Sequence, residues 1–109
     1  MLVTKNGVCI DGMKPEILLA IVAMHECYQR RGKTLMLTSV GDGKHMQGSK
    51  HYQGLAFDCR ISNLGVGEPE KIAKELRLAL HPLFDVVLES DHIHVEYDPP
   101  NSEAEAPVA

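Results

Sequence analysis

The feature that most constrains the fold is a strand-like alternation near the end of the chain, in the segment Asp91-His92-Ile93-His94-Val95-Glu96-Tyr97. Residues i and i+2 of a β-strand share a face, so His92, His94 and Glu96 are predicted to lie on one face and the apolar residues on the other. The earlier run 54–61 alternates in part and places four residues on one face: Gly54, Ala56, Asp58 and Arg60. The two runs predict neighbouring strands that present Asp58 and His94 to one cleft.

A metal site is the chemistry that this arrangement favours. His51 lies just before the first of the two strands, and with Asp58 and His94 it makes a set of two imidazoles and one carboxylate. Zn²⁺ takes these ligands readily, and three protein ligands leave a fourth position open, as is typical of catalytic zinc sites. Small residues beside Asp58 leave room there. The pattern therefore favours a small zinc-dependent hydrolase.

Two motifs carry a family resemblance. The run Ser49 to Asp58 reads Ser-x-His-x-x-Gly-x-Ala-x-Asp, and His92 and His94 form a His-x-His motif. Together they resemble the zinc peptidases of the M15 family, which include D-Ala-D-Ala carboxypeptidases and phage L-alanyl-D-glutamate endopeptidases. The hedgehog signalling domain belongs to the same wider group. Motif order and separation make the match more specific than either piece alone.

The resemblance implies a zinc ligand set of His51, Asp58 and His94. It implies that Asp91, three residues before His94, takes a proton from the attacking water and hands it to the leaving amine. His92 would stabilise the oxyanion of the tetrahedral intermediate. The resemblance also places Ser49 against the substrate backbone.

The sequence allows a second register for the acid and the histidine. Glu89 and His92 have the same spacing as Asp91 and His94. Strand alternation and the residues after His94 favour the Asp91/His94 register, but the Glu89/His92 register stays open.

The stretch 38–45 departs from the family pattern. Many members carry an Arg upstream of the first ligand that grips the substrate carboxylate, and this stretch has none. Arg60, Lys44 or Lys50 are candidate replacements, and we assign Arg60 and His45 to substrate binding. For Arg60 the alternative is a surface ion pair, and for His45 a solvated loop histidine. Without the usual Arg, we favour an endopeptidase cut over release of a terminal D-Ala.

Composition sets the limits of this interpretation. The chain has 109 residues and a net charge of −4, without a basic stripe, so nucleic-acid binding is not indicated. It has no apolar run of about 18 residues, so no membrane span is expected. Three cysteines without a C-x-x-C motif are expected to be reduced and buried. We predict one domain over residues 1–100 and a disordered tail over 101–109.

The expected fold class is α+β, with helices packed on one face of a small antiparallel sheet and the zinc site in the open cleft. Proline at a first turn and apolar residues at helical spacing predict helices over 15–31 and 69–80. Strands are predicted over 34–40, 84–89 and 92–97. The core face of the first helix is predicted from its apolar spacing as Ile17, Leu18, Ile21, Val22, His25 and Tyr28.

These observations lead to the expectation of a zinc metallopeptidase that hydrolyses an amide bond in the peptidoglycan stem peptide. Because the first residues carry no signal-peptide pattern, we expect synthesis in the cytoplasm and action on the cell wall after release or from a virion, as for phage lysins. The alternative is a non-catalytic zinc-bearing structural or binding module on the same fold. The oligomeric state is left open.

Overall fold

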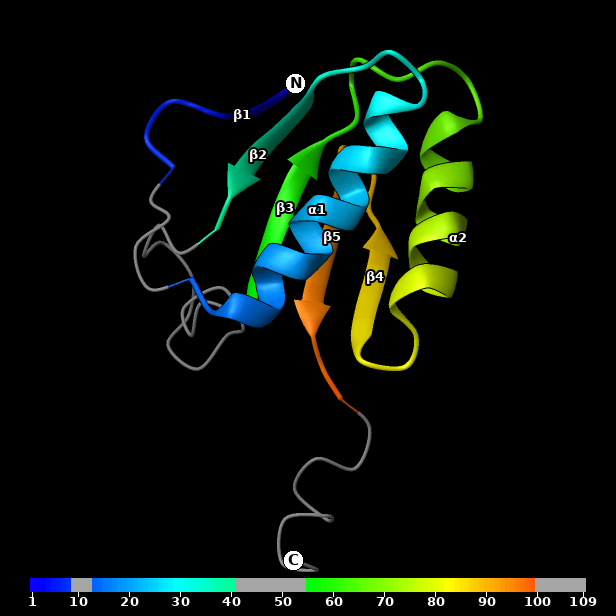
Figure 1. The fold of residues 1–109 in the computed structure, drawn as a ribbon. Coiled ribbons are helices and arrows are strands. Elements are labelled where there is room, and N and C mark those ends of the chain that lie inside the picture. Colours follow the sequence, from blue (N-terminus) through cyan, green and yellow to red (C-terminus); the bar gives the residue numbers. More distant parts are fainter. Residues whose placement is uncertain (9–12, 41–54, 100–109) are drawn as a thin grey trace, which may run out of the picture.

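The computed structural model describes residues 1–8, 13–40 and 55–99. The described residues form five strands and two helices (Figure 1). In chain order they are β1 (Leu2–Thr4), α1 (Pro15–Gln29), β2 (Leu35–Ser39), β3 (Ala56–Arg60), α2 (Glu68–Leu80), β4 (Phe84–Leu88) and β5 (His92–Tyr97). The α+β fold class and both helices are confirmed, and so is the strand nature of the four segments predicted to be strands. The proposed tail over 101–109 lies outside the described residues.

The sheet is mixed rather than antiparallel, which corrects the prediction. Its strand order is β1-β2-β3-β5-β4, and β1 pairs with β2 in parallel while the other three pairs are antiparallel. A parallel pair needs a crossover connection, and the chain between β1 and β2 contains α1. The prediction was wrong because β1 has only three residues and no detectable alternation.

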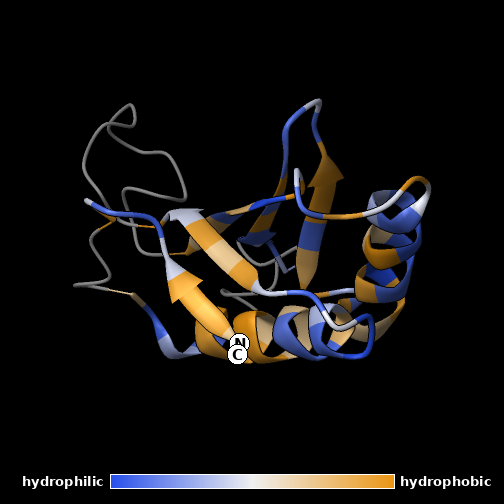
Figure 2. Ribbon diagram, turned by 90° about the horizontal axis from the view of Figure 1, so that it is seen from above, coloured by the Kyte–Doolittle hydropathy of each residue, from blue (hydrophilic) through white to orange (hydrophobic). Residues whose placement is uncertain are grey.

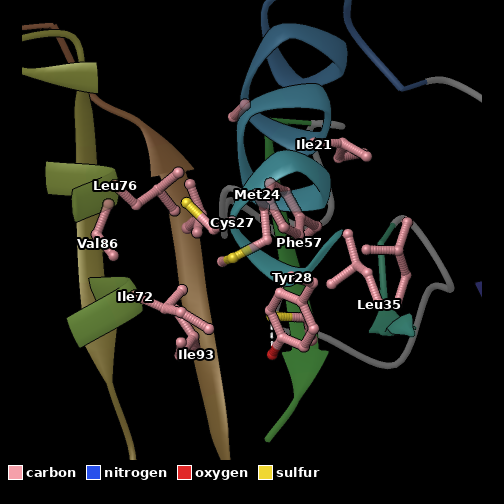
Figure 3. Close-up of a cluster of buried hydrophobic side chains, with 14 of the residues drawn as sticks. Ile21, Met24, Cys27, Tyr28, Leu35, Phe57, Ile72, Leu76, Val86 and Ile93 are labelled. Atoms are coloured by element: carbon pink, nitrogen blue, oxygen red, sulfur yellow. Dashed lines mark hydrogen bonds between the residues drawn. The ribbon is translucent and has the colours of Figure 1, made fainter. Parts of the chain in front are cut away.

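Both helices pack on one side of the sheet, as expected. Figure 2 shows α1 running below the strands and α2 standing beside the β4 end of the sheet. The helix side holds the core, which joins both helices to the sheet through buried apolar side chains (Figure 3). Those that the figure labels are Ile21, Met24, Cys27, Tyr28, Leu35, Phe57, Ile72, Leu76, Val86 and Ile93.

The buried face of α1 differs in part from the predicted one. Ala20, Met24 and Cys27 join the core, whereas Leu18 and Val22 are exposed. The helix is apolar over much of its circumference, so its spacing of apolar residues does not single out one face. Its end also differs by two residues from the prediction, within the usual uncertainty of helix boundaries.

An ion-pair cluster joins the end of α1 to the middle of α2. Arg31 donates to both carboxylate oxygens of Glu75, at 3.2 and 2.7 Å, and Arg30 donates to Oε1 at 3.1 Å. The hydrogen bond from Arg31 is the main cause that lowers the pKa of Glu75 to about 2. The cluster fixes the two helices against each other beside the core.

The two cysteines in the described ranges, Cys27 and Cys59, are free and buried, as predicted. Burial raises the pKa of the Cys59 thiol to about 12, so the sulfur stays protonated. Cys59 faces the core rather than the side that carries Asp58, and the Tyr28 hydroxyl lies 3.6 Å from its sulfur. Within the described residues, no helix has the length and apolar character needed to cross a bilayer.

Candidate functional site

The site begins with two neighbouring strands that alternate between core residues and residues on the opposite face of the sheet. Phe57 and Cys59 of β3 and Ile93 and Val95 of β5 are buried completely. Because strand side chains alternate, the residues between them point to the face away from the helices. The register of β3 and β5 sets Asp58 opposite His94 and Arg60 opposite His92. The predicted cleft residues therefore share one face of the sheet.

Asp58 and His94 are in direct contact. Their Oδ1 and Nδ1 atoms lie 2.8 Å apart, and the two side chains are only 16% and 20% exposed. The other ring nitrogen of His94, Nε2, lies 2.8 Å from Oε1 of Glu96, two residues along the same strand. The ring of His94 is thus held between two carboxylates.

His92 extends this arrangement toward the turn between β4 and β5. Its Nδ1 donates to Oδ1 of Asp91 at 2.6 Å, and its Nε2 lies 3.8 Å from Oδ1 of Asp58. Five side chains therefore alternate as acid and imidazole across one face, and we call them the acid–imidazole row. In order they are Asp91, His92, Asp58, His94 and Glu96.

The charges of the row explain the protonation of His94. The hydrogen bond to Asp58 is the largest cause that raises the pKa of His94 to about 9, and Glu96 adds to it while burial opposes it. Without a metal, His94 is an imidazolium at neutral pH and donates one N–H to each carboxylate. A metal ion that binds Nδ1 must displace the proton there.

Asp58 and His94 offer the atom types that zinc binds, at a separation close to that of two zinc ligands. Zn²⁺ holds nitrogen and oxygen ligands at about 2.0–2.1 Å, so two ligand atoms of a tetrahedral site lie about 3.3 Å apart. The 2.8 Å between Asp58 Oδ1 and His94 Nδ1 is close to that spacing and needs only a small side-chain rotation to reach it. Among the described residues, no group of three or more His, Cys, Asp or Glu side chains is arranged to hold a metal ion.

Three of the predicted site residues, His45, Ser49 and His51, lie outside the described residues. The structure therefore does not describe one of the three predicted zinc ligands or two of the predicted substrate contacts, and the whole ligand set stays a prediction. The structure brings together four of the other five: Asp58, His94, His92 and Asp91.

Asp91 stands at the edge of the site. It lies in the tight turn that joins β4 to β5, where the backbone N–H of Glu89 donates to the carbonyl of His92 at 2.8 Å. Its side chain is 84% exposed, and its hydrogen bond goes to His92 rather than to Asp58 or His94. Glu89, the acid of the alternative register, is exposed at the end of β4. Asp58 lies near both His94 and His92, so the Asp91/His94 register stays a prediction.

Arg60 sits beside His92 on the neighbouring strand. Its buried Nε atom has no hydrogen-bond partner, and its side chain forms no ion pair with any acid of the described ranges. Its backbone carbonyl accepts the Tyr28 hydroxyl hydrogen bond at 2.6 Å, which ties this end of β3 to α1. The surface ion pair considered from the sequence is thus not seen for Arg60 in the part of the chain that the structure describes.

Two features of the site were not assigned from the sequence. Ser39 of β2 pairs with Asp58, because the β2–β3 register shifts between Leu37 and Ser39, and its side chain is buried. A polar residue at the end of an apolar strand was the available signal. The sequence left the role of Glu96 undecided, and the structure gives it a contact with His94.

Comparison of the chain with protein-family models, with curated proteins and with solved structures finds no match.

Proposed function

We propose that the protein is a zinc-dependent peptidase that hydrolyses an amide bond in the peptidoglycan stem peptide. The observation that carries the proposal is the 2.8 Å contact between Asp58 and His94, on facing positions of neighbouring strands. These are two of the three ligands of the motif pattern that resembles the M15 peptidases. Their partial burial supports metal binding, because carboxylate and imidazole ligands bind a metal more tightly when water is largely excluded.

In this proposal, His51, Asp58 and His94 hold Zn²⁺. The metal would supply a Lewis acid that polarises the scissile carbonyl and lowers the pKa of the attacking water. Side chains of the protein would carry out the proton transfers and stabilise the oxyanion. Asp58 and His94 lie on the face of the sheet away from the helices, so a peptide substrate would meet the metal on that side.

Asp91 and His92 are the proposed catalytic residues. Asp91 accepts the proton of the attacking water and returns it to the leaving amine, and its exposure allows it to exchange protons with solvent. With protons on both ring nitrogens, His92 would donate from Nε2 to the oxyanion, since Nε2 is the ring nitrogen that faces Asp58. The hydrogen bond from Nδ1 to Asp91 orients the ring for this role.

Arg60 is the proposed substrate-binding cation, together with Ser49 and His45. Arg60 is opposite His92 in the strand register and has no acidic partner in the described ranges, so it is available for a substrate carboxylate. Because the stretch 38–45 lacks the usual Arg, we favour cleavage within the stem over release of its terminal D-Ala. The enzyme would act on the cell wall after release from the cytoplasm or from a virion.

Metal analysis and a digest together test the proposal. We expect one zinc per chain in protein purified without chelator, and loss of that zinc in Asp58→Asn and His94→Ala. His81→Ala is the matched control, because His81 is exposed at the end of α2, away from the row. With muropeptides, mass spectrometry should find cleavage within the stem peptide.

The contrary outcomes separate the alternatives. Release of disaccharides would exclude a peptidase, because glycan hydrolysis requires paired carboxylates around an oxocarbenium-like centre. Free D-Ala as the sole product would replace the endopeptidase by a carboxypeptidase. Full zinc occupancy without any cleavage would leave the non-catalytic zinc module.

A further inference from the structure

Glu96 is an acid on the cleft face whose hydrogen bond goes to an imidazole. Its Oε1 lies 2.8 Å from Nε2 of His94, and its side chain is partly buried at 23% exposure. No Lys or Arg of the described ranges forms an ion pair with it. The Glu96 carboxylate is therefore not engaged with a surface cation and acts on the ring of His94.

The neighbours of Glu96 make its negative charge unfavourable at this position, and the contact with His94 offsets that cost. Across the sheet, Glu96 is opposite Ala56 on β3 and Asp85 on β4. Like charges directly opposite each other on antiparallel strands are destabilising. The acid beside Asp85 is offset by the imidazole of His94, since the described strands offer no other positive group in contact with it.

We propose that Glu96 is a positioning residue that selects the ring nitrogen with which His94 binds the metal. The inference rests on the proposed function. By accepting a hydrogen bond from Nε2–H, Glu96 fixes the proton on Nε2 and turns Nδ1 toward Asp58. A carboxylate on the non-ligating nitrogen fixes the tautomer and orientation of a metal-binding histidine and increases its basicity.

Zinc affinity is the first test, measured by competition with a chromophoric chelator. We expect Glu96→Ala to weaken zinc binding by about 10–100-fold, the usual effect of removing such a partner. Glu96→Gln should lose less, because its amide oxygen still accepts the N–H hydrogen bond. Asp85→Asn is the matched control, since it removes a carboxylate from the opposite position of the adjacent strand, and its zinc affinity should equal that of the wild type.

A spectroscopic measurement gives a second readout that a merely structural role would not move. In zinc-loaded wild-type protein, long-range ¹H–¹⁵N spectra of His94 should show a protonated Nε2 and a metal-bound Nδ1. In Glu96→Ala the spectra should show a mixture of the two tautomers of His94, with zinc bound to either ring nitrogen. Binding of zinc through Nε2 in the wild type overturns the inference, even if the variants fail to fold.

The outcomes distinguish this inference from the proposed function. If the wild type binds zinc, and Glu96→Ala binds it equally well with the same tautomer, Glu96 has no positioning role and the peptidase proposal stands. If the wild type binds no zinc, the proposed function and this inference fail together.

Discussion

Asp58 and His94 face each other across the β3–β5 pair although they are 36 residues apart in the sequence. The buried residues on either side of them, Phe57, Cys59, Ile93 and Val95, fix this relationship, because a slip of one residue would turn the apolar side chains to solvent. The same packing that builds the core therefore sets the spacing of Asp58 Oδ1 and His94 Nδ1, the two proposed ligand atoms.

Asp91→Asn should retain zinc but lower kcat by about 10²-fold or more, the usual consequence of losing a general acid or base. Glu89→Gln is the matched control, because Glu89 is the exposed acid two residues earlier. Turnover of stem peptides and zinc content should be measured for both variants. If Glu89→Gln loses activity and Asp91→Asn keeps it, the acid and histidine are Glu89 and His92.

Arg60→Gln should raise KM with little change in kcat, for muropeptides that carry a free carboxylate. A charge-assisted hydrogen bond contributes about 1.5–3 kcal/mol, which corresponds to roughly 10–100-fold in affinity. Lys71→Gln is the control, because Lys71 is an exposed cation on α2, on the helix side of the sheet. An equal KM for Arg60→Gln and the wild type would remove Arg60 from substrate binding.

The free energy of unfolding should fall at acid pH as Glu75 becomes protonated. The pKa of Glu75 is lowered to about 2 in the folded state, from an ordinary value of 4.5, chiefly by the hydrogen bond from Arg31. A group with a lowered pKa stabilises the fold above its unfolded pKa, and this contribution is lost as pH falls from about 4.5 toward 2.

Glu75→Gln should therefore narrow the difference in urea midpoint between pH 6 and pH 3. The loss at neutral pH should be no more than about 1 kcal/mol, because the carboxylate is partly exposed and screened by solvent. Glu70→Gln, a change to another acid of α2, provides the control. An unchanged pH dependence in Glu75→Gln would show that the ion pair contributes nothing measurable.

Leu76→Ala should destabilise the fold by about 2–5 kcal/mol, since Leu76 is fully buried between α2 and the sheet and its truncation leaves a cavity. Leu78 lies on the same helix and is 75% exposed. Leu78→Ala should change the free energy of unfolding by no more than about 0.5 kcal/mol. Chemical denaturation of both variants checks the assignment, and equal effects would contradict the packing of α2.

The sequence predicts much of the fold because its strongest patterns coincide with the strands that build the site. Alternation around His92 and His94 predicts β5 and its polar face, and the shorter alternation around Asp58 predicts β3. Pro15 correctly predicts the first residue of α1, because proline is favoured in the first turn of a helix. These patterns are local, and local patterns identify strands and helices well.

The remainder depends on contacts between distant segments. Strand β1 is too short to show a period, so its parallel pairing with β2 is visible only in the structure. The ion pair of Arg31 and Glu75 joins residues 44 positions apart, and no spacing rule indicates it. The partners of the row were likewise not predicted in detail: Asp91 bonds His92, and Glu96 bonds His94.

If the protein binds zinc as proposed, the pairing of β3 with β5 couples metal binding to folding. Asp58 and His94 come together only when these strands are paired, so the unfolded chain holds neither the spacing nor the shielding from water that would favour metal binding. A ligand that binds the native state alone shifts the folding equilibrium toward it by an amount set by its concentration and affinity. Added zinc would then act as a cofactor of folding as well as of catalysis, and its removal would lower the melting temperature together with the activity.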